Sequence, residues 1–164
     1  MLISLRCFPQ SLSELKAMPE SSLTSPEYTA ALTVASLCLY EDNPREMSAM
    51  LEFLKGPNGA LSPFENQFLR DRLGDGRAYI PRSFFVGAVP ENDYTPSSPS
   101  IDINRNQYSQ TDDTHITLWM TSGGADNPRQ ISMRLKPSTG QWFLNDGFGF
   151  LSGIRTPVSK DPWA

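Results

Sequence analysis

His115 is the only histidine in the chain, and its imidazole is the side chain best suited to move protons near neutral pH. A single histidine excludes a metal site built from two histidines of this chain. His115 opens a strictly alternating run in which it shares one strand face with Thr117, Trp119 and Thr121. We interpret it as a structural or partly exposed residue, with proton transfer by this imidazole as the alternative.

Cys7 and Cys38 are the only cysteines, and their separation fits neither a redox pair nor a zinc motif. Cys38 lies in a strongly apolar segment, where a free thiol behaves as a small buried hydrophobe. We therefore expect two structural thiols and a reducing compartment, with a Cys7–Cys38 disulfide as the alternative for an exported protein. Cysteine catalysis is not expected, because a reactive thiol needs an exposed, electropositive site.

Two loop-like segments imitate ligand-binding motifs. Residues 102–113 carry oxygen-bearing side chains at calcium-loop spacing, but Gln107 stands where the sharp turn requires glycine. Residues 122–126 are glycine-rich like a phosphate loop, but a strand follows them instead of a helix. We interpret the first as an Asx-rich turn and the second as a hairpin connection, so we predict no metal and no cofactor.

The face of the predicted sheet opposite the core combines an indole, Trp119, with a guanidinium, Arg134. Either Trp142 or Phe143 extends this face from the last strand. One interpretation is a shallow pocket for a small anionic or planar ligand, or for a partner peptide. The candidate ligand-binding residues are Thr117, Trp119, Arg134, His115 and Tyr94.

The competing interpretation of this face is structural. An indole on a nominally solvent face needs a cover, which residues 87–99 or the C-terminal tail would supply. Tyr94 or Trp163 is the side chain expected to form that lid.

Helix starts dominate the first half of the chain. Ser11, Ser25, Asn43 and Ser62 are capping residues, and the last three precede proline and an acid. The pattern predicts a short helix from Ser11 that Pro19 stops, and helices over 26–41, 44–55 and 63–73. Capping boxes are expected at Ser11–Glu14, Asn43–Glu46 and Ser62–Glu65. Residues 26–41 are apolar nearly all round, so they should form the central helix of the core. In the last helix, Phe64, Phe68 and Leu69 are expected to point inward.

After residue 79 the sequence changes to strand and turn signals. We predict strands over 83–86, 115–121, 130–136 and 141–144, a short edge strand around 101–103, and loops over 87–99 and 104–113. The strands over 115–121, 130–136 and 141–144 are expected to form an antiparallel meander. Residues 148–154 are expected to form a last helical turn or strand.

Helices followed by an antiparallel sheet predict an α+β fold. We expect one domain over 1–164, with a helical half over 11–74, a sheet half over 83–145 and a tail over 146–164. The helices should pack on one sheet face, formed by Ile116, Leu118, Met120, Ile131, Met133 and Leu135. A cone-like sheet wrapping one helix, as in NTF2-like and cystatin-like folds, is the specific expectation.

The bulk properties bound the partners. The 164 residues carry a net charge of −4, and their cations are scattered singly, so nucleic acid is not the expected partner. No run is long and apolar enough for a membrane span, and the first ten residues do not resemble a signal peptide. We expect a cytoplasmic protein with a protein or small-molecule partner.

Several runs carry a family resemblance. They are residues 62–69, 81–88, 90–96, 122–126, 138–144 and 161–164. Over nearly the whole chain they resemble an uncharacterised bacterial domain-of-unknown-function family, encoded largely by anaerobic Clostridia-type bacteria. Residues 147–151 are more glycine-rich than is usual in that family, and Ser100 stands where the family often has tyrosine. The resemblance implies a bacterial, intracellular protein and brings no activity or catalytic residues.

Three hypotheses of function remain, and one of them, a small immunity or regulatory protein that binds another protein, depends on the acidic charge alone. The first is a non-catalytic binding or interaction module that uses the Trp119 and Arg134 face, or a homodimer interface. The second is a small hydrolase or isomerase with acid–base groups from His115, Asp93 or Asp126 in a cone-shaped pocket. The second depends on analogy between folds.

Overall fold

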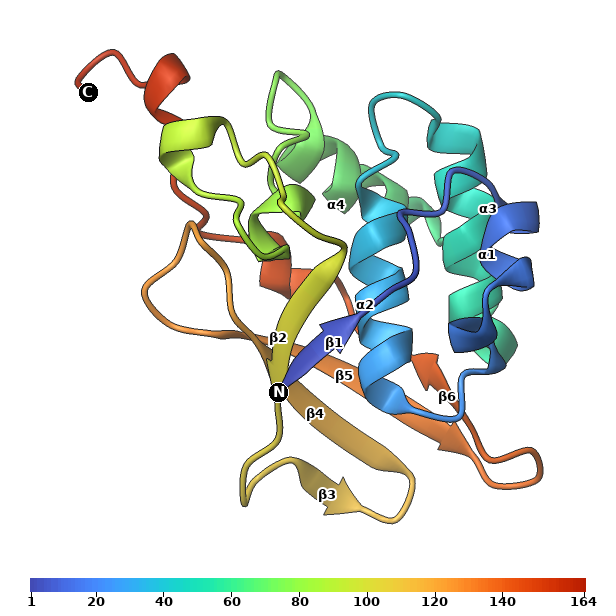
Figure 1. The fold of residues 1–164 in the computed structure, drawn as a ribbon. Coiled ribbons are helices and arrows are strands. Elements are labelled where there is room, and N and C mark those ends of the chain that lie inside the picture. The colour runs from blue at the N-terminus through green and yellow to red at the C-terminus, as the bar shows by residue number, and fades with distance from the viewer.

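The computed structural model describes residues 1–164 as one short strand, four α-helices and then the remaining strands of a curled antiparallel sheet (Figure 1). The helices are α1 (Leu12–Ala17), α2 (Pro26–Leu37), α3 (Pro44–Lys55) and α4 (Pro63–Leu73). The strands are β1 (Leu2–Ser4), β2 (Ser100–Asn104), β3 (Gln110–Asp112), β4 (His115–Met120), β5 (Arg129–Lys136) and β6 (Gln141–Leu144). The α+β prediction is confirmed.

All four predicted caps form. The side chains of Ser11, Ser25, Asn43 and Ser62 each accept a hydrogen bond from the amide three residues later. The reciprocal half of the capping box forms only at Ser62, where Glu65 accepts from the Ser62 amide. The boxes predicted at Ser11 and Asn43 are wrong, because their acids bind other amides: Glu14 accepts from Gln10, and Glu46 accepts from Leu12.

The Glu46 contact has a structural consequence. Its carboxylate lies 3.0 Å from the amide of Leu12, one of the unpaired donors of the first turn of α1. A side chain of α3 therefore caps a helix of only six residues, too short to be stable by itself.

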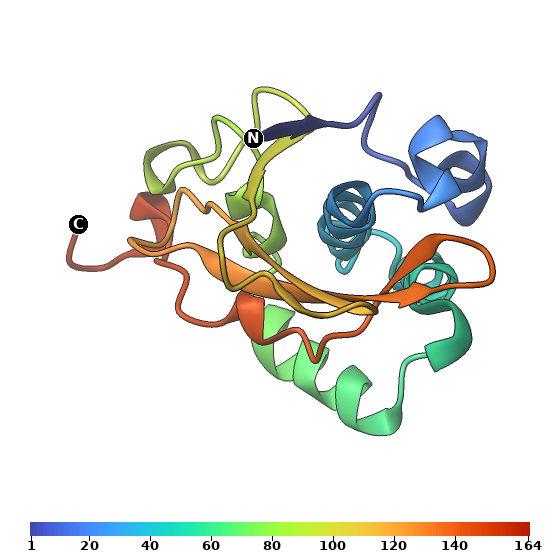
Figure 2. The same ribbon diagram turned by 90° about the horizontal axis from the view of Figure 1, so that it is seen from below.

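The sheet has the order β1-β2-β4-β5-β6, and every pairing is antiparallel. β3 pairs with β4 as well, next to the stretch that β2 occupies. Figure 2 shows the sheet curving around α2, which contacts β1, β2, β5 and β6. In the same view α4 lies on the opposite side of the strands from α2.

α2 is the central helix that its apolar sequence predicts. Every residue from Pro26 to Leu37 except Tyr28 is buried. The hydroxyls of Thr33 and Ser36 donate to the carbonyl oxygens of Thr29 and Leu32, four residues earlier, at 2.8 and 2.7 Å. These polar groups are therefore satisfied inside the helix, which allows burial on all sides.

The free edge of β6 is closed by the helical half. The Trp142 amide donates to the Leu23 carbonyl at 2.7 Å, and the Trp142 carbonyl accepts from the Thr29 hydroxyl at 2.9 Å. The Asn58 amide group donates to the Leu144 carbonyl at 2.9 Å. An edge strand whose backbone is already paired does not recruit a further strand.

Two predicted strands are corrected. Residues 83–86 do not form a strand: Pro81–Phe84 is a 3₁₀ helix, and Phe85 makes one isolated bridge to Ile101. A short apolar run does not distinguish these structures by periodicity, and Pro81 favours the helical turn. The short strand predicted around 101–103 is β2 in the structure. It is not an edge strand, because β1, which was not predicted, pairs with it on the side away from β4.

Phe64 is also a correction, because its side chain points outward and is 77% exposed. Leu69 and Leu73, four residues apart, form the buried stripe of α4. Phe64 lies five residues before Leu69 and is off this stripe.

The sheet face predicted to be inner is buried at Ile116, Leu118, Met120, Ile131 and Met133. This face belongs to one core cluster with α2, α3 and the tail residues Phe148 and Phe150.

Residues 148–154 contain a single 3₁₀ turn, Gly149–Leu151, as one of the two expected alternatives. None of the helices combines the length and apolarity needed to cross a bilayer.

Candidate functional site

A row of four chemically different side chains crosses the outer face of the sheet. The register pairs Asp112 with His115, His115 with Arg134, and Arg134 with Phe143. Directly paired residues project from the same face, with neighbouring strands about 5 Å apart. The row therefore runs from a carboxylate through an imidazole and a guanidinium to a phenyl ring.

The carboxylate and the imidazole form a dyad. His115 Nδ1 lies 3.0 Å from Asp112 Oδ1 and 3.1 Å from Oδ2. The backbone amide of Thr114, the His115 ring and the Thr114 hydroxyl together lower the pKa of Asp112 to about 2. An ionised carboxylate at Nδ1 favours a proton on that nitrogen, which leaves Nε2 as the basic atom of the neutral ring.

The next row of this face, Thr117 and Ser132, is half-buried, and the row after it combines the half-buried Trp119 with the exposed Gln130 and Asn104. The hydroxyls of Thr117 and Ser132 lie 3.3 Å apart across β4 and β5. Trp119 pairs with Gln130 on β5 and with Asn104 on β2. Trp119 is half-buried on the outer face, as the alternation predicts.

A hollow of about 170 Å³ lies where this row reaches β6. Its lining residues are Pro57, Asn58, Arg134, Leu135, Lys136, Pro137 and Phe143. The β5–β6 hairpin supplies most of them, and the 3₁₀ turn Gly56–Asn58 after α3 supplies the rest. The hydrogen bond from Asn58 to the Leu144 carbonyl holds that turn against β6.

Phe143 separates this hollow from a second, more apolar groove of about 460 Å³. The second groove lies between α1, α3 and β6, and its apolar lining includes Leu12, Leu23 and Phe53. The Lys16 ammonium lies 5.6 Å from the centroid of the Phe53 ring, so the one cation in that groove has an aromatic partner.

The position of Phe143 depends on Gly56. A Cβ added to Gly56 would lie 2.3 Å from the Phe143 ring, and Gly56 has φ +53°. Both the close approach and the backbone angle require glycine.

Gly56→Ala is therefore expected to displace Phe143 and to lower the free energy of unfolding by about 1–2 kcal/mol. Urea denaturation measures this loss. Gly140→Ala tests the backbone contribution alone, because Gly140 has φ +71° and nothing within 4 Å of its added Cβ. An equal loss in both variants, with unchanged Phe143 ring resonances, would contradict the packing argument.

Arg134 and Lys136 are unusual among the cations of this chain. Most of its 14 lysines and arginines donate a hydrogen bond, form an ion pair or lie over an aromatic ring. The exceptions are Arg6, Arg45, Arg134 and Lys136. Two of these four lie on the same face of β5 and line the same hollow.

The structure places Tyr94 away from the other predicted site residues. Its side chain is fully buried, stacks on Tyr79 with ring centroids 5.4 Å apart, and donates to the Arg155 carbonyl at 2.6 Å. Burial raises the pKa of Tyr94 to about 12. Trp163 is 93% exposed, so it does not form the lid that the structural interpretation requires.

The acids proposed to assist His115 contact the C-terminal segment instead. Asp93 accepts a hydrogen bond from Ser159, and Asp126 pairs with Arg155 at 2.9 Å. Asp112, three residues before His115, is the acid that reaches the imidazole. Sequence reasoning missed it because it placed residues 104–113 in a loop and did not expect β3.

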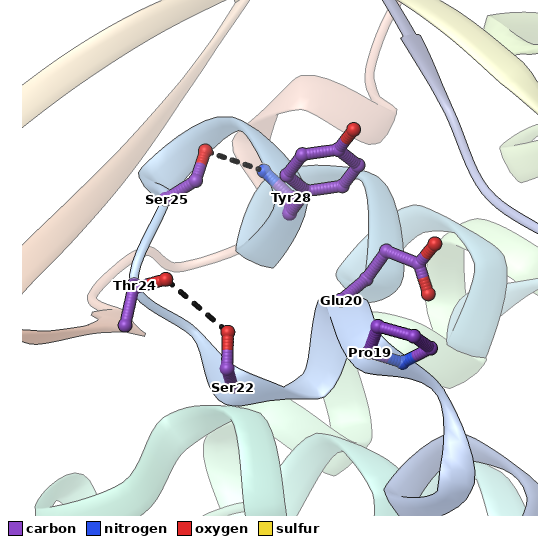
Figure 3. Close-up of a pocket in the computed structure, with 6 residues that line it drawn as sticks. All are labelled: Pro19, Glu20, Ser22, Thr24, Ser25 and Tyr28. Carbon is purple, nitrogen blue, oxygen red and sulfur yellow. Dashed lines mark hydrogen bonds between the residues drawn. The ribbon is translucent and has the colours of Figure 1, made fainter.

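Two further cavities are poorer candidates. The one in Figure 3, of about 270 Å³, is lined mainly by Ser22, Thr24, Ser25 and Glu20, and the Glu20 carboxylate points away from Ser22 and Thr24. The other, of about 230 Å³, contains Cys38. Burial raises the pKa of the Cys38 thiol to about 12, so this thiol is inert.

The fold and this surface define an α+β protein with a curled sheet whose outer face carries cations beside an aromatic ring. The chain belongs to the family described as a domain of unknown function, DUF6935, whose model matches residues 7–158. No curated protein and no solved structure is similar enough to this chain to be matched.

Proposed function

We propose that the chain is a non-catalytic binding module of bacterial, Clostridia-type origin. Its ligand-binding surface is the hollow formed by Arg134, Lys136 and Phe143, which we call the β5–β6 site. The observation that carries this proposal is the pair of cations without protein partners beside an aromatic ring. Positive charge without a partner is conspicuous in a chain whose net charge is −4.

The chemistry of the site supports a specific ligand. A guanidinium binds carboxylates and phosphates through a fork of donors, and an aromatic side chain offers a flat contact surface. The volume is small, so the ligand covers the hollow and extends beyond it. Cys7 and Cys38 are both free, which supports a cytoplasmic location for this function.

A thermal-shift screen against a panel of metabolites tests the proposal. A ligand at 100-fold its dissociation constant is expected to raise the melting temperature by about 5 °C or more. Arg134→Ala should abolish this shift, whereas Arg45→Ala should retain it, because Arg45 is another exposed cation without a partner and lies outside the site. A ligand that stabilises both variants equally would refute the β5–β6 site.

The Asp112–His115 dyad favours a second candidate, a small hydrolase or isomerase. Asp112 orients the imidazole, and Arg134 follows in the same row, where it would stabilise an anionic intermediate. Turnover of p-nitrophenyl acetate that falls 100-fold or more in His115→Gln would support this candidate. Turnover that is absent, or unchanged in the variant, would reject the hydrolase form of this candidate.

A further inference from the structure

We infer that the ligand of the β5–β6 site is a soluble phosphate monoester with an aromatic or otherwise flat organic part. This inference rests on the proposed function and specifies the ligand chemistry of the same site.

The spacing of the cations favours an anion with several oxygens. Arg134 and Lys136 are two residues apart on β5, so their side chains leave the same face about 7 Å apart along the strand. Both line the hollow, and neither has a protein partner there. Two cations on the same face can each donate to a different oxygen of one tetrahedral anion, whereas a single arginine fork already satisfies a planar carboxylate.

The charge of the site points to the same chemistry. A phosphate monoester carries about −1.5 to −2 charges at neutral pH, and a carboxylate carries −1. Arg134 and Lys136 together supply a matching charge. No carboxylate lines this hollow, whereas the apolar groove on the other side of Phe143 contains Glu52 as well as Lys16.

Phe143 accounts for the organic part of the ligand. Gly56 packs against the Phe143 ring, and Pro57 and Asn58 of the same 3₁₀ turn line the hollow next to it. The ring is half-buried, so part of its surface remains available for contact. A flat group attached to the phosphate would stack there while the phosphate stays between the cations.

Isothermal titration calorimetry with phenyl phosphate tests this inference on the full chain. We expect saturable binding that weakens about tenfold or more in Arg134→Ala and in Lys136→Ala. Phe143→Leu, which keeps an apolar side chain, should weaken phenyl phosphate binding but not the binding of inorganic phosphate. Arg45→Ala removes one exposed charge elsewhere and should leave the affinity within a factor of two.

The variants are first compared by circular dichroism and urea denaturation, so that a folding defect is not mistaken for lost binding. Phenyl phosphate that does not bind, or that binds all variants equally, would overturn the inference. Binding only to vesicles that contain phosphatidic acid would also overturn it, because the phosphate would then be lipid-borne.

Benzoate and benzyl alcohol separate this inference from the proposed function. If either binds with Arg134-dependent affinity while phenyl phosphate does not, the β5–β6 site stands and the phosphate inference falls. If phenyl phosphate, benzoate and every compound of the metabolite panel leave the protein unchanged, both proposals fall together.

Discussion

Glu65→Ala is expected to lower the free energy of unfolding by about 3–5 kcal/mol. The Glu65 carboxylate accepts from the Lys55 ammonium at 2.5 Å, and the two side chains are only 16% and 8% exposed. Its removal would leave the buried Lys55 ammonium with one remaining acceptor, the Ala60 carbonyl at 3.2 Å. It would also break the capping box that begins α4.

Urea denaturation of a matched set checks this prediction. The double variant Lys55→Met with Glu65→Gln removes both charges and keeps a side chain that can cap α4, so it should recover most of the lost stability. Glu52→Ala, an exposed acid on α3, should change stability by less than about 0.5 kcal/mol. A double variant as unstable as Glu65→Ala would show that the unpaired charge is not the cause.

Arg105→Ala is expected to lower the free energy of unfolding by about 2–3 kcal/mol. Arg105 binds both carboxylate oxygens of Glu27, and its terminal nitrogen lies 3.0 Å from Oε2. The Glu27 side chain is 6% exposed, so the variant would retain a buried carboxylate whose only side-chain donor is the Ser25 hydroxyl. The loss is below that of a fully buried pair, because half of Arg105 is exposed to water.

The pH dependence of stability gives this prediction a distinct signature. Burial pushes the pKa of Glu27 upward, but the hydrogen bonds and charge of Arg105 outweigh it and lower the pKa below 4.5. A carboxyl whose pKa is lower in the folded state stabilises the fold fully above its unfolded value, and this stabilisation fades as the pH falls through the folded value. Between pH 7 and pH 3, the free energy of unfolding measured by urea denaturation should therefore fall less in Arg105→Ala than in the parent protein.

Arg45→Ala serves as the control, since it removes an exposed arginine that has no partner. Its stability should follow that of the parent protein over the whole pH range. A pH profile for Arg105→Ala that is parallel to the parent profile would contradict the assignment of acid sensitivity to the Glu27 pair.

Local sequence chemistry predicted the helices because helix starts depend on neighbouring residues. Ser25, Asn43 and Ser62 each place a side-chain acceptor before a proline, and α2, α3 and α4 begin at those prolines. The second halves of the capping boxes were less predictable. Glu46 binds Leu12, 34 residues away, because tertiary packing brings α1 next to α3.

The strands were predicted where one face is buried and the other is not. β4 and β5 alternate, so the face on which their side chains lie follows from the sequence. β1 and β3 have three residues each and show too little pattern to be identified. The strand predicted over 83–86 was wrong because Phe84 and Phe85 are both buried, and a strand and a tight turn can both bury them.

The residues of the candidate site also divide into those that a local sequence pattern predicts and those that tertiary packing brings to the site. Trp119 and Arg134 were placed on the outer face by alternation, and Trp142 and Phe143 were left as alternatives on the last strand. The register pairs Arg134 with Phe143, so Phe143 is the residue that extends this face. The contributions of Asn58 and Gly56 depend on how α3 ends above β6, which no local pattern encodes. Tyr94 could not be placed from sequence, because its stacking on Tyr79 joins two irregular segments.

The most direct test of the β5–β6 site is a two-dimensional NMR titration of the labelled protein with the best hit of the metabolite screen. We predict that the largest shift changes map to Arg134, Lys136, Phe143 and Asn58, with those of Leu12 and Phe53 in the apolar groove unchanged. Changes confined to the apolar groove, or to the hollow around Ser22 and Thr24, would contradict the account.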